Sequence, residues 1–276
     1  MRQLQGDWRR KLQALATELG FDADRLRKGV TSEQLYETLR TLSWLAPLDR
    51  PRVVDAALRT CTWSPRVRTA LARVLYEHDD PRATRTGVEL LLWDGIEPLS
   101  VFGVDTLYHI SNRDPSYLLS VAQSDADEWS DALLVQVLQT VRNCETTIDP
   151  NAIEWVISYL DRDSPEVRAE ALEVIAQYGW SSLLWSQIDP ETHLADRSPL
   201  VRRAAYRLVG AFGDEAAIDS LAAAVKRDPD DRARLVGVRQ LRETDWRIDA
   251  DLDRSSKFWQ AWRWVAVREQ FEEAHP

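Results

Sequence analysis

The chain has 276 residues, of which 44% are hydrophobic and 29% charged, and its formal net charge is −10. This composition is typical of a folded protein and argues against intrinsic disorder. No apolar run is long enough to cross a membrane, and the excess of carboxylates disfavours general affinity for the phosphate backbone of DNA or RNA.

The N-terminus and the two cysteines indicate a reducing compartment. Residues 1–8 lack the apolar run of a signal peptide, so a cytoplasmic location is expected. Cys61 and Cys144 are the only cysteines and lie far apart in the sequence. They are expected to be buried thiols rather than a disulfide.

Prolines mark where helices begin. Eight of the twelve prolines follow Ser or Asp. Proline loses no hydrogen bond at the first helical position, and the preceding Ser or Asp can cap the helix, which is worth about 1 kcal/mol. Together with a capping box at residues 31–34 and apolar spacings of three and four, these starts predict helices in chain order. The expected ranges are 7–19, 32–45, 51–61, 65–77, 81–93, 98–111, 115–123, 129–143, 150–160, 165–178, 199–212, 214–226, 229–243 and 256–273. Residues 179–197 are less regular and are compatible with short helices, and no segment alternates as a strand does.

A five-residue motif, Ser-Pro-x-Val-Arg, recurs at residues 64–68, 164–168 and 198–202. The last two copies begin 34 residues apart, and the first two begin 100 apart, which is about three such periods. A period of this length is typical of stacked helical hairpins, each of which buries its apolar face only against its neighbours.

Residues 163–172 and 196–205 resemble HEAT repeats, and residues 209–221 are similar to the turn and second helix of short bacterial HEAT-like repeats. The resemblance is clearest over 161–243. It implies an all-α fold, a right-handed α-solenoid of stacked antiparallel helix pairs. It also implies that Arg68, Arg168 and Arg202 form a structural ladder, each pairing with an aspartate of an adjacent repeat.

The organisation expected from these patterns is a single HEAT-like solenoid over 1–276. Residues 1–50 would form divergent N-terminal helices, residues 51–254 the repeats, and residues 255–276 a Trp-rich C-terminal cap. The aromatic residues of the last segment, among them Trp259 and Trp262, would cover the last exposed core or form a docking site.

Motifs for catalysis are absent from the sequence. No glycine-rich phosphate loop, nucleophile elbow or zinc-binding pattern occurs. The densest group of potential metal ligands, residues 77–80, falls at a helix end and is expected to be a solvated loop. No catalytic residue, metal or cofactor is therefore expected, although the chain's status as an enzyme stays open.

The acidic excess is concentrated in the middle of the chain. Residues 105–175 carry 14 acidic and 4 basic side chains. A surface of this kind would attract a basic partner, or its acids would simply cover solvated helices and favour the starts of following helices. The candidate partner-binding residues are Trp180, Trp185, Asp125, Asp127, Glu128, Trp129, Trp259 and Trp262.

The function expected from the sequence is that of a non-catalytic scaffold or adaptor. It would bind a basic protein or peptide on its concave face, as an immunity or regulatory subunit for example. Two alternatives remain: a DNA-binding or DNA-repair protein of the glycosylase type, for which arginines of the C-terminal half would form a basic stripe, or a subunit of a lyase. The arginines in question are Arg202, Arg203, Arg207, Arg232, Arg234, Arg239 and Arg242.

Overall fold

A computed structural model describes residues 23–30, 34–48, 51–60, 64–178, 185–244, 246–248 and 253–274, with positions 11, 14, 15, 18 and 62. Its contacts divide the chain into two compact units. Unit 1 comprises Met1–Gln136 and Asn143–Thr147, and unit 2 comprises Val137–Arg142 and Ile148–Pro276. The expectation of one continuous domain over 1–276 stays a prediction.

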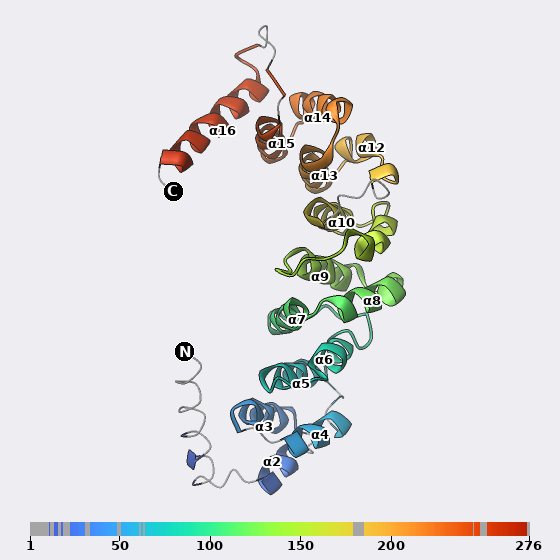
Figure 1. Ribbon diagram of the computed structural model, residues 1–276, viewed down its shortest axis with the longest axis vertical. Coiled ribbons are helices and arrows are strands. Elements are labelled where there is room, and N and C mark those ends of the chain that lie inside the picture. Colours follow the sequence, from blue (N-terminus) through green and yellow to red (C-terminus); the bar gives the residue numbers. More distant parts are fainter. Residues whose placement is uncertain are drawn as a thin grey trace. The chain divides into compact units, whose positions relative to one another are not determined.

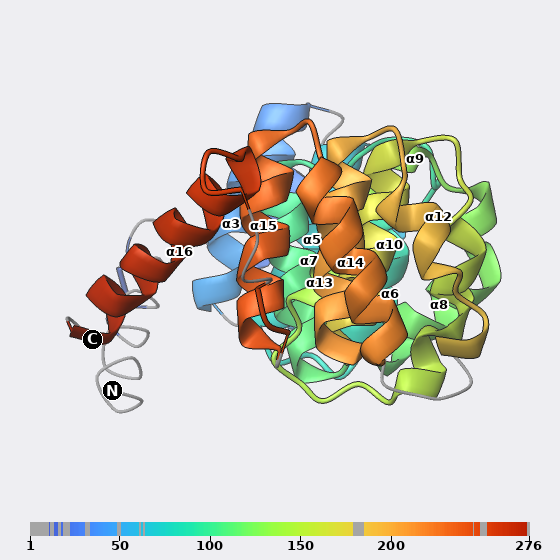
Figure 2. The ribbon, with the colours of Figure 1, turned by 90° about the horizontal axis from the view of Figure 1, so that it is seen from above.

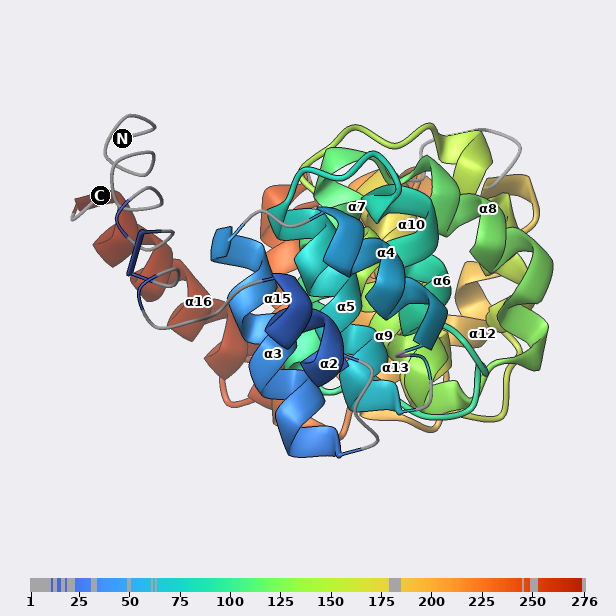
Figure 3. The ribbon, with the colours of Figure 1, turned by 90° about the horizontal axis from the view of Figure 1, so that it is seen from below.

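Unit 1 is built of helices that pack on their neighbours in sequence. They are α2 (Ala23–Val30), α3 (Leu35–Leu48), α4 (Pro51–Thr60), α5 (Pro65–Glu77), α6 (Ala83–Leu91), α7 (Val101–Arg113), α8 (Ser116–Asp125) and the short 3-10 helix η1 (Ala126–Glu128). Helix α5 packs against α3, α6 and α7, and α6 also packs against α8 (Figures 1 and 3). Alternate helices therefore form one row, α3, α5 and α7, with α4, α6 and α8 beside it.

The division between the units falls within helix α9 (Asp131–Arg142), and unit 2 is also built of helices. Its elements are the 3-10 helix η2 (Pro150–Tyr159), α10 (Pro165–Tyr178), α12 (Pro190–Leu194), α13 (Pro199–Phe212), α14 (Glu215–Arg227), α15 (Asp231–Glu243) and α16 (Lys257–Ala274). Helix α13 packs against α10, α12, α14 and α15, so it is the centre of this unit (Figure 2).

The all-α expectation is confirmed for the described residues, which contain helices and no strand. The eight prolines preceded by Ser or Asp lie within two residues of a helix start. The expectation of an α-helix at 150–160 was wrong, because this segment forms the 3-10 helix η2. The sequence patterns also missed α2, and the expected helix 7–19 lies largely outside the described residues.

Each unit has a core of aliphatic side chains at the spacings expected for helices. In α13, Val201, Ala205 and Leu208 are buried, and in α10 the equivalent positions are Val167, Ala171 and Val174. The apolar faces of successive pairs thus cover one another, which is how a solenoid stabilises repeats that have no core of their own.

The first half of the C-terminal helix α16 packs against α15 and α14, and the helix extends beyond α15 (Figures 1 and 2). Phe258, Ala261 and Val265 are buried. The Trp262 ring lies 5.8 Å from that of Trp246, and both flank Phe258. The expectation that residues 255–276 form a cap stays a prediction.

Gly237 of α15 allows three helices to meet closely. A methyl group at this position would lie 2.2 Å from Val225 Cγ2 of α14 and 3.0 Å from Tyr206 Cδ2 of α13. In an open helix, Gly→Ala stabilises by about 1 kcal/mol. We expect Gly237→Ala instead to lower the free energy of unfolding by about 1–3 kcal/mol, because the core is overpacked. Urea denaturation followed by circular dichroism measures this, and an increase in stability would contradict the packing.

Candidate interaction surface

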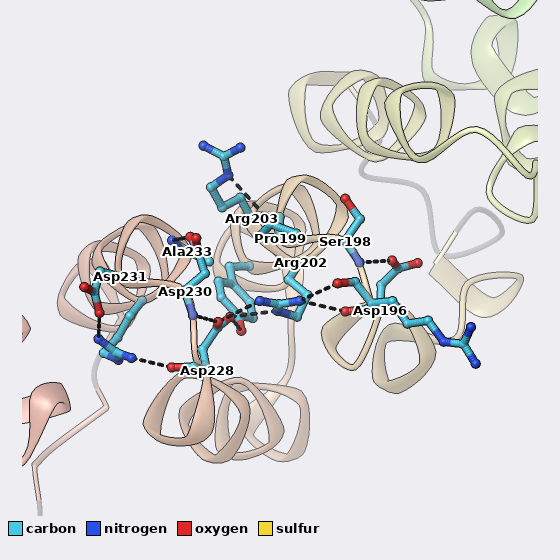
Figure 4. A network of polar contacts seen from close by, with 12 residues as sticks. Asp196, Ser198, Pro199, Arg202, Arg203, Asp228, Asp230, Asp231 and Ala233 are labelled. Atoms are coloured by element: carbon cyan, nitrogen blue, oxygen red, sulfur yellow. Dashed lines mark hydrogen bonds and ion pairs between the residues drawn. The ribbon is translucent and has the colours of Figure 1, made fainter.

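The strongest polar contact in unit 2 joins Arg202 of α13 to Asp228 in the loop after α14 (Figure 4). Arg202 Nε donates to Oδ2 and Nη2 to Oδ1 of the carboxylate, each at 2.8 Å. The Asp228 side chain is 0% exposed. A bidentate pair in this setting fixes both the distance and the orientation between α13 and the loop after α14.

The Asp228 carboxylate is satisfied from several sides. Tyr206 Oη donates to Oδ2 at 2.5 Å, and the Asp230 backbone N–H donates to Oδ1 at 2.8 Å. Burial alone would raise the pKa of Asp228, but the hydrogen bonds from Arg202 and Tyr206 outweigh burial, so the pKa lies below its usual value. The sequence patterns did not predict the part that Tyr206 plays.

The other two arginines of the motif make related contacts. Arg168 donates from Nε and Nη2 to the carboxylate of Asp196, with distances of 3.0–3.1 Å. Arg68 reaches Asp94 with a single contact of 3.5 Å. The ladder geometry is thus tight in unit 2 and loose in unit 1.

A second contact ties each of these arginines to its own repeat. The guanidinium donates to the backbone carbonyl six residues before it: Arg68 to Thr62, Arg168 to Arg162 and Arg202 to Asp196. Arg234 makes the same contact with the carbonyl of Asp228. It is a fourth arginine with this carbonyl contact, and the Ser-Pro-x-Val-Arg motif missed it.

The acidic residues Asp125, Asp127 and Glu128 lie exposed at the C-terminal end of α8 and in η1. The expectation that these acids precede the next helix was wrong for Asp125, because α8 continues through this residue, whereas Asp127 and Glu128 lie in the 3-10 turn before α9. Helix α9 begins later, and its first free N–H groups are capped by Ser130, whose Oγ accepts from Leu133 N at 3.2 Å. A carboxylate at the C-terminal end of a helix is locally unfavourable, because the helix dipole is negative there.

Trp129 holds this acidic segment in place. Its side chain is only 4% exposed, so it belongs to the core of unit 1 rather than to a docking surface. Gly95, with φ of 67°, lies directly against the indole, and a Cβ there would be 2.7 Å from Trp129 Cδ1. Ser130 N also donates to Gly95 O at 2.8 Å. The loop before α7 therefore positions the acidic segment after α8.

The remaining tryptophan candidates do not converge on one site in the described residues. Trp180 lies outside the described residues. Trp185 is half-buried in the segment before α12, and Trp259 and Trp262 are half-buried on α16. Arg242 of α15 lies over the Trp262 ring, 5.2 Å from its centre. Trp262 thus contributes to holding α16 on α15.

The polar residues expected to be a solvated loop are engaged in ion pairs. Asp80 pairs with Arg82 at 2.6 Å and Asp79 with Arg113 at 2.8 Å. The hydrogen bond from Arg82 lowers the pKa of Asp80.

No group of three metal-ligating side chains converges in the described part of the chain. Burial raises the pKa of the Cys144 thiol to about 11, which keeps it unreactive.

A hollow of about 480 Å³ lies between α12, α13 and α14. Ala195, Ala223 and Pro229 contribute apolar walls, and Arg202 and Asp228 also line it. Those two side chains are already paired with each other, so the ladder contact forms part of the wall of the hollow.

Residues 190–242, which include α12 to α15 and the Arg202–Asp228 pair, match the family model for HEAT repeats. This segment is made of HEAT repeats. Arg168 of α10 lies outside this segment and pairs with Asp196 inside it, which extends the ladder toward α10 within the same unit. Neither the curated proteins nor the solved structures contain a match to the chain. No described helix is both long enough and apolar enough to span a bilayer.

The ladder geometry predicts unequal costs for removing its aspartates. Asp228→Ala leaves a buried guanidinium unpaired, so we expect the free energy of unfolding to fall by about 3–5 kcal/mol. The control Asp94→Ala also affects a buried guanidinium, but it removes a single contact of 3.5 Å to a carboxylate that is 40% exposed, so we expect a smaller loss of about 1–2 kcal/mol. Urea denaturation of both variants provides the comparison. Equal losses would contradict the distinction between tight and loose pairs.

The lowered pKa of Asp228 also predicts a pH dependence. A carboxyl whose pKa is lower in the folded state stabilises the fold above its unfolded pKa of about 4, and this contribution is lost as the pH falls through the folded pKa. The difference in unfolding free energy between wild type and Asp228→Asn should therefore be largest near neutral pH and shrink below about pH 4. Urea titrations across this range measure it, and a difference that grows on acidification would exclude this cause.

Proposed function

We propose that the chain is a non-catalytic scaffold that binds a basic protein or peptide through the exposed acidic residues Asp125, Asp127 and Glu128. HEAT repeats are a protein-interaction kind of fold. The observation that carries the proposal is a stretch of sequence in which every charged side chain is acidic. Residues 114–141 contain five carboxylates and no Lys, Arg or His. Such a surface steers a cationic partner and speeds its association.

The position of these acids supports a binding role over a stabilising one. Asp125 is the last residue of α8, where a carboxylate opposes the helix dipole. A cation from a partner would offset this unfavourable interaction. Stability of the isolated chain therefore gives no reason for a carboxylate at this position, whereas attraction of a basic partner does.

The alternative of a nucleic-acid-binding protein has less support, because several of its arginines are occupied within the fold. Arg202 and Arg234 are buried. Arg207 pairs with Glu173, and Arg242 with Glu269. Arg232 and Arg239 are exposed, so at most a part of the expected basic stripe faces solvent without an ion pair.

The experiment that tests the proposal uses a fluorescein-labelled peptide of Lys and Arg residues and measures its anisotropy. Wild type should bind it more weakly as salt rises from about 20 to about 300 mM, because salt screens exposed charges. Asp125→Lys combined with Glu128→Lys should weaken binding about tenfold at low salt. The same substitutions should leave the free energy of unfolding unchanged or raise it by about 0.3–1 kcal/mol, since an unfavourable charge at a helix end is removed.

A matched control reverses two exposed acids of unit 2, Asp219→Lys with Glu243→Lys, and makes the same change in net charge. This control should retain most of the affinity. Equal weakening by both pairs would show that only net charge matters, and binding that does not depend on salt would exclude the electrostatic basis of the proposal.

A further inference from the structure

Exposed apolar side chains gather on the loop between α6 and α7 and on the first turn of α7. Trp93 is 59%, Ile96 68% and Val101 89% exposed, and Phe102 follows Val101 with its ring half exposed. Large apolar residues grouped in this way on a protein surface commonly mark an interaction site.

A hollow of about 230 Å³ opens beside this apolar group. Leu90, Leu91, Pro65, Pro98 and Leu99 provide its apolar walls, and Arg68, Asp94 and Glu97 line it as well. We call this hollow, together with Trp93 and Ile96, the loop pocket. It lies wholly within unit 1.

The Arg68 guanidinium in the loop pocket is incompletely paired. The side chain is 9% exposed, and its buried Nε has no hydrogen-bond partner among the described residues. In unit 2 the corresponding Nε atoms of Arg168 and Arg202 both donate to a carboxylate. A buried charged donor without an acceptor is costly, so a ligand that offers an acceptor gains affinity here.

Carboxylates surround the same pocket. Asp94 and Glu97 are exposed on the loop. The loop also touches the acidic segment after α8, since Gly95 packs against Trp129 and lies near the backbone oxygen of Glu128. The loop with the apolar group and the acidic segment are thus neighbours within unit 1, joined through the buried Gly95 and Trp129.

We propose that the loop pocket docks a peptide segment of the basic partner, one in which apolar side chains alternate with Lys or Arg. Its apolar side chains cover Trp93 and Ile96, a main-chain carbonyl accepts from Arg68 Nε, and its cations face Asp94 and Glu97. A free anion would meet these two carboxylates, and a wholly apolar ligand would leave Arg68 Nε unpaired. The inference rests on the proposed function and adds where the partner binds and what sequence it presents.

The test compares two labelled peptides of equal length and charge, one alternating Lys with Leu and the other alternating Lys with Ser. Wild type should bind the Lys–Leu peptide about tenfold more tightly, because apolar anchors dominate binding at such sites. Ile96→Ser should remove this preference, and Glu97→Lys should weaken both peptides. Val267→Ser on α16 is the control, because it removes a similarly exposed apolar side chain, 58% exposed, in unit 2.

The outcomes separate the two proposals. If neither peptide binds in a salt-dependent way, the proposed function fails and the loop pocket fails with it. If both peptides bind equally well, or if Ile96→Ser keeps the preference for Lys–Leu, the loop pocket is wrong while the scaffold function stands. A preference lost equally in Val267→Ser would also overturn the assignment to the loop pocket.

Discussion

The buried pair between Arg202 and Asp228 is the contact on which the order of the repeats in unit 2 depends. Apolar burial brings helices together but tolerates sliding, because it has no direction. The guanidinium of Arg202 donates to the carbonyl of Asp196 in the loop before α13 and to the carboxylate of Asp228 in the loop after α14. It therefore sets the register between successive repeats, and α12 to α15 take their positions around it.

Much of this arrangement could be predicted from the sequence. Ser or Asp before proline located half of the helix starts in the described residues, because capping and proline geometry act locally. The ladder was expected from the resemblance of the repeated motif to HEAT repeats. The motif could not show that Arg234 makes the same carbonyl contact, because Ser-Pro-x-Val-Arg does not occur around it, or that Tyr206 shares Asp228, because these two residues lie on different elements. The pattern also placed Asp125 wrongly before the next helix, because it does not show that α8 continues through this residue.

The Ser-Pro-x-Val-Arg motif makes different contacts in the two units. In unit 2 the arginine donors are matched by carboxylates at close range, which favours rigidity. In unit 1 the corresponding contact between Arg68 and Asp94 is long, and it lies in a loop whose apolar residues face outward. One Ser-Pro-x-Val-Arg sequence thus supports a closed contact in one place and an open, polar recess in another. Asp94 and Asp228 both stand 26 positions after their arginine, so the surroundings of the aspartate, and not its spacing, distinguish the two results.

Arg234 has a consequence for where the fold first opens. The position 26 residues after it is Gln260 of α16, so no aspartate stands where the spacing of Arg202 and Asp228 would place one. Arg234 pairs instead with Asp231 of its own helix, whose carboxylate is largely exposed. The junction of α15 with α16 lacks the bidentate cross-link that holds α13 and depends instead on Arg242, which pairs with Glu269 and lies over Trp262. We therefore expect the amide protons of α15 to exchange with solvent before those of α13.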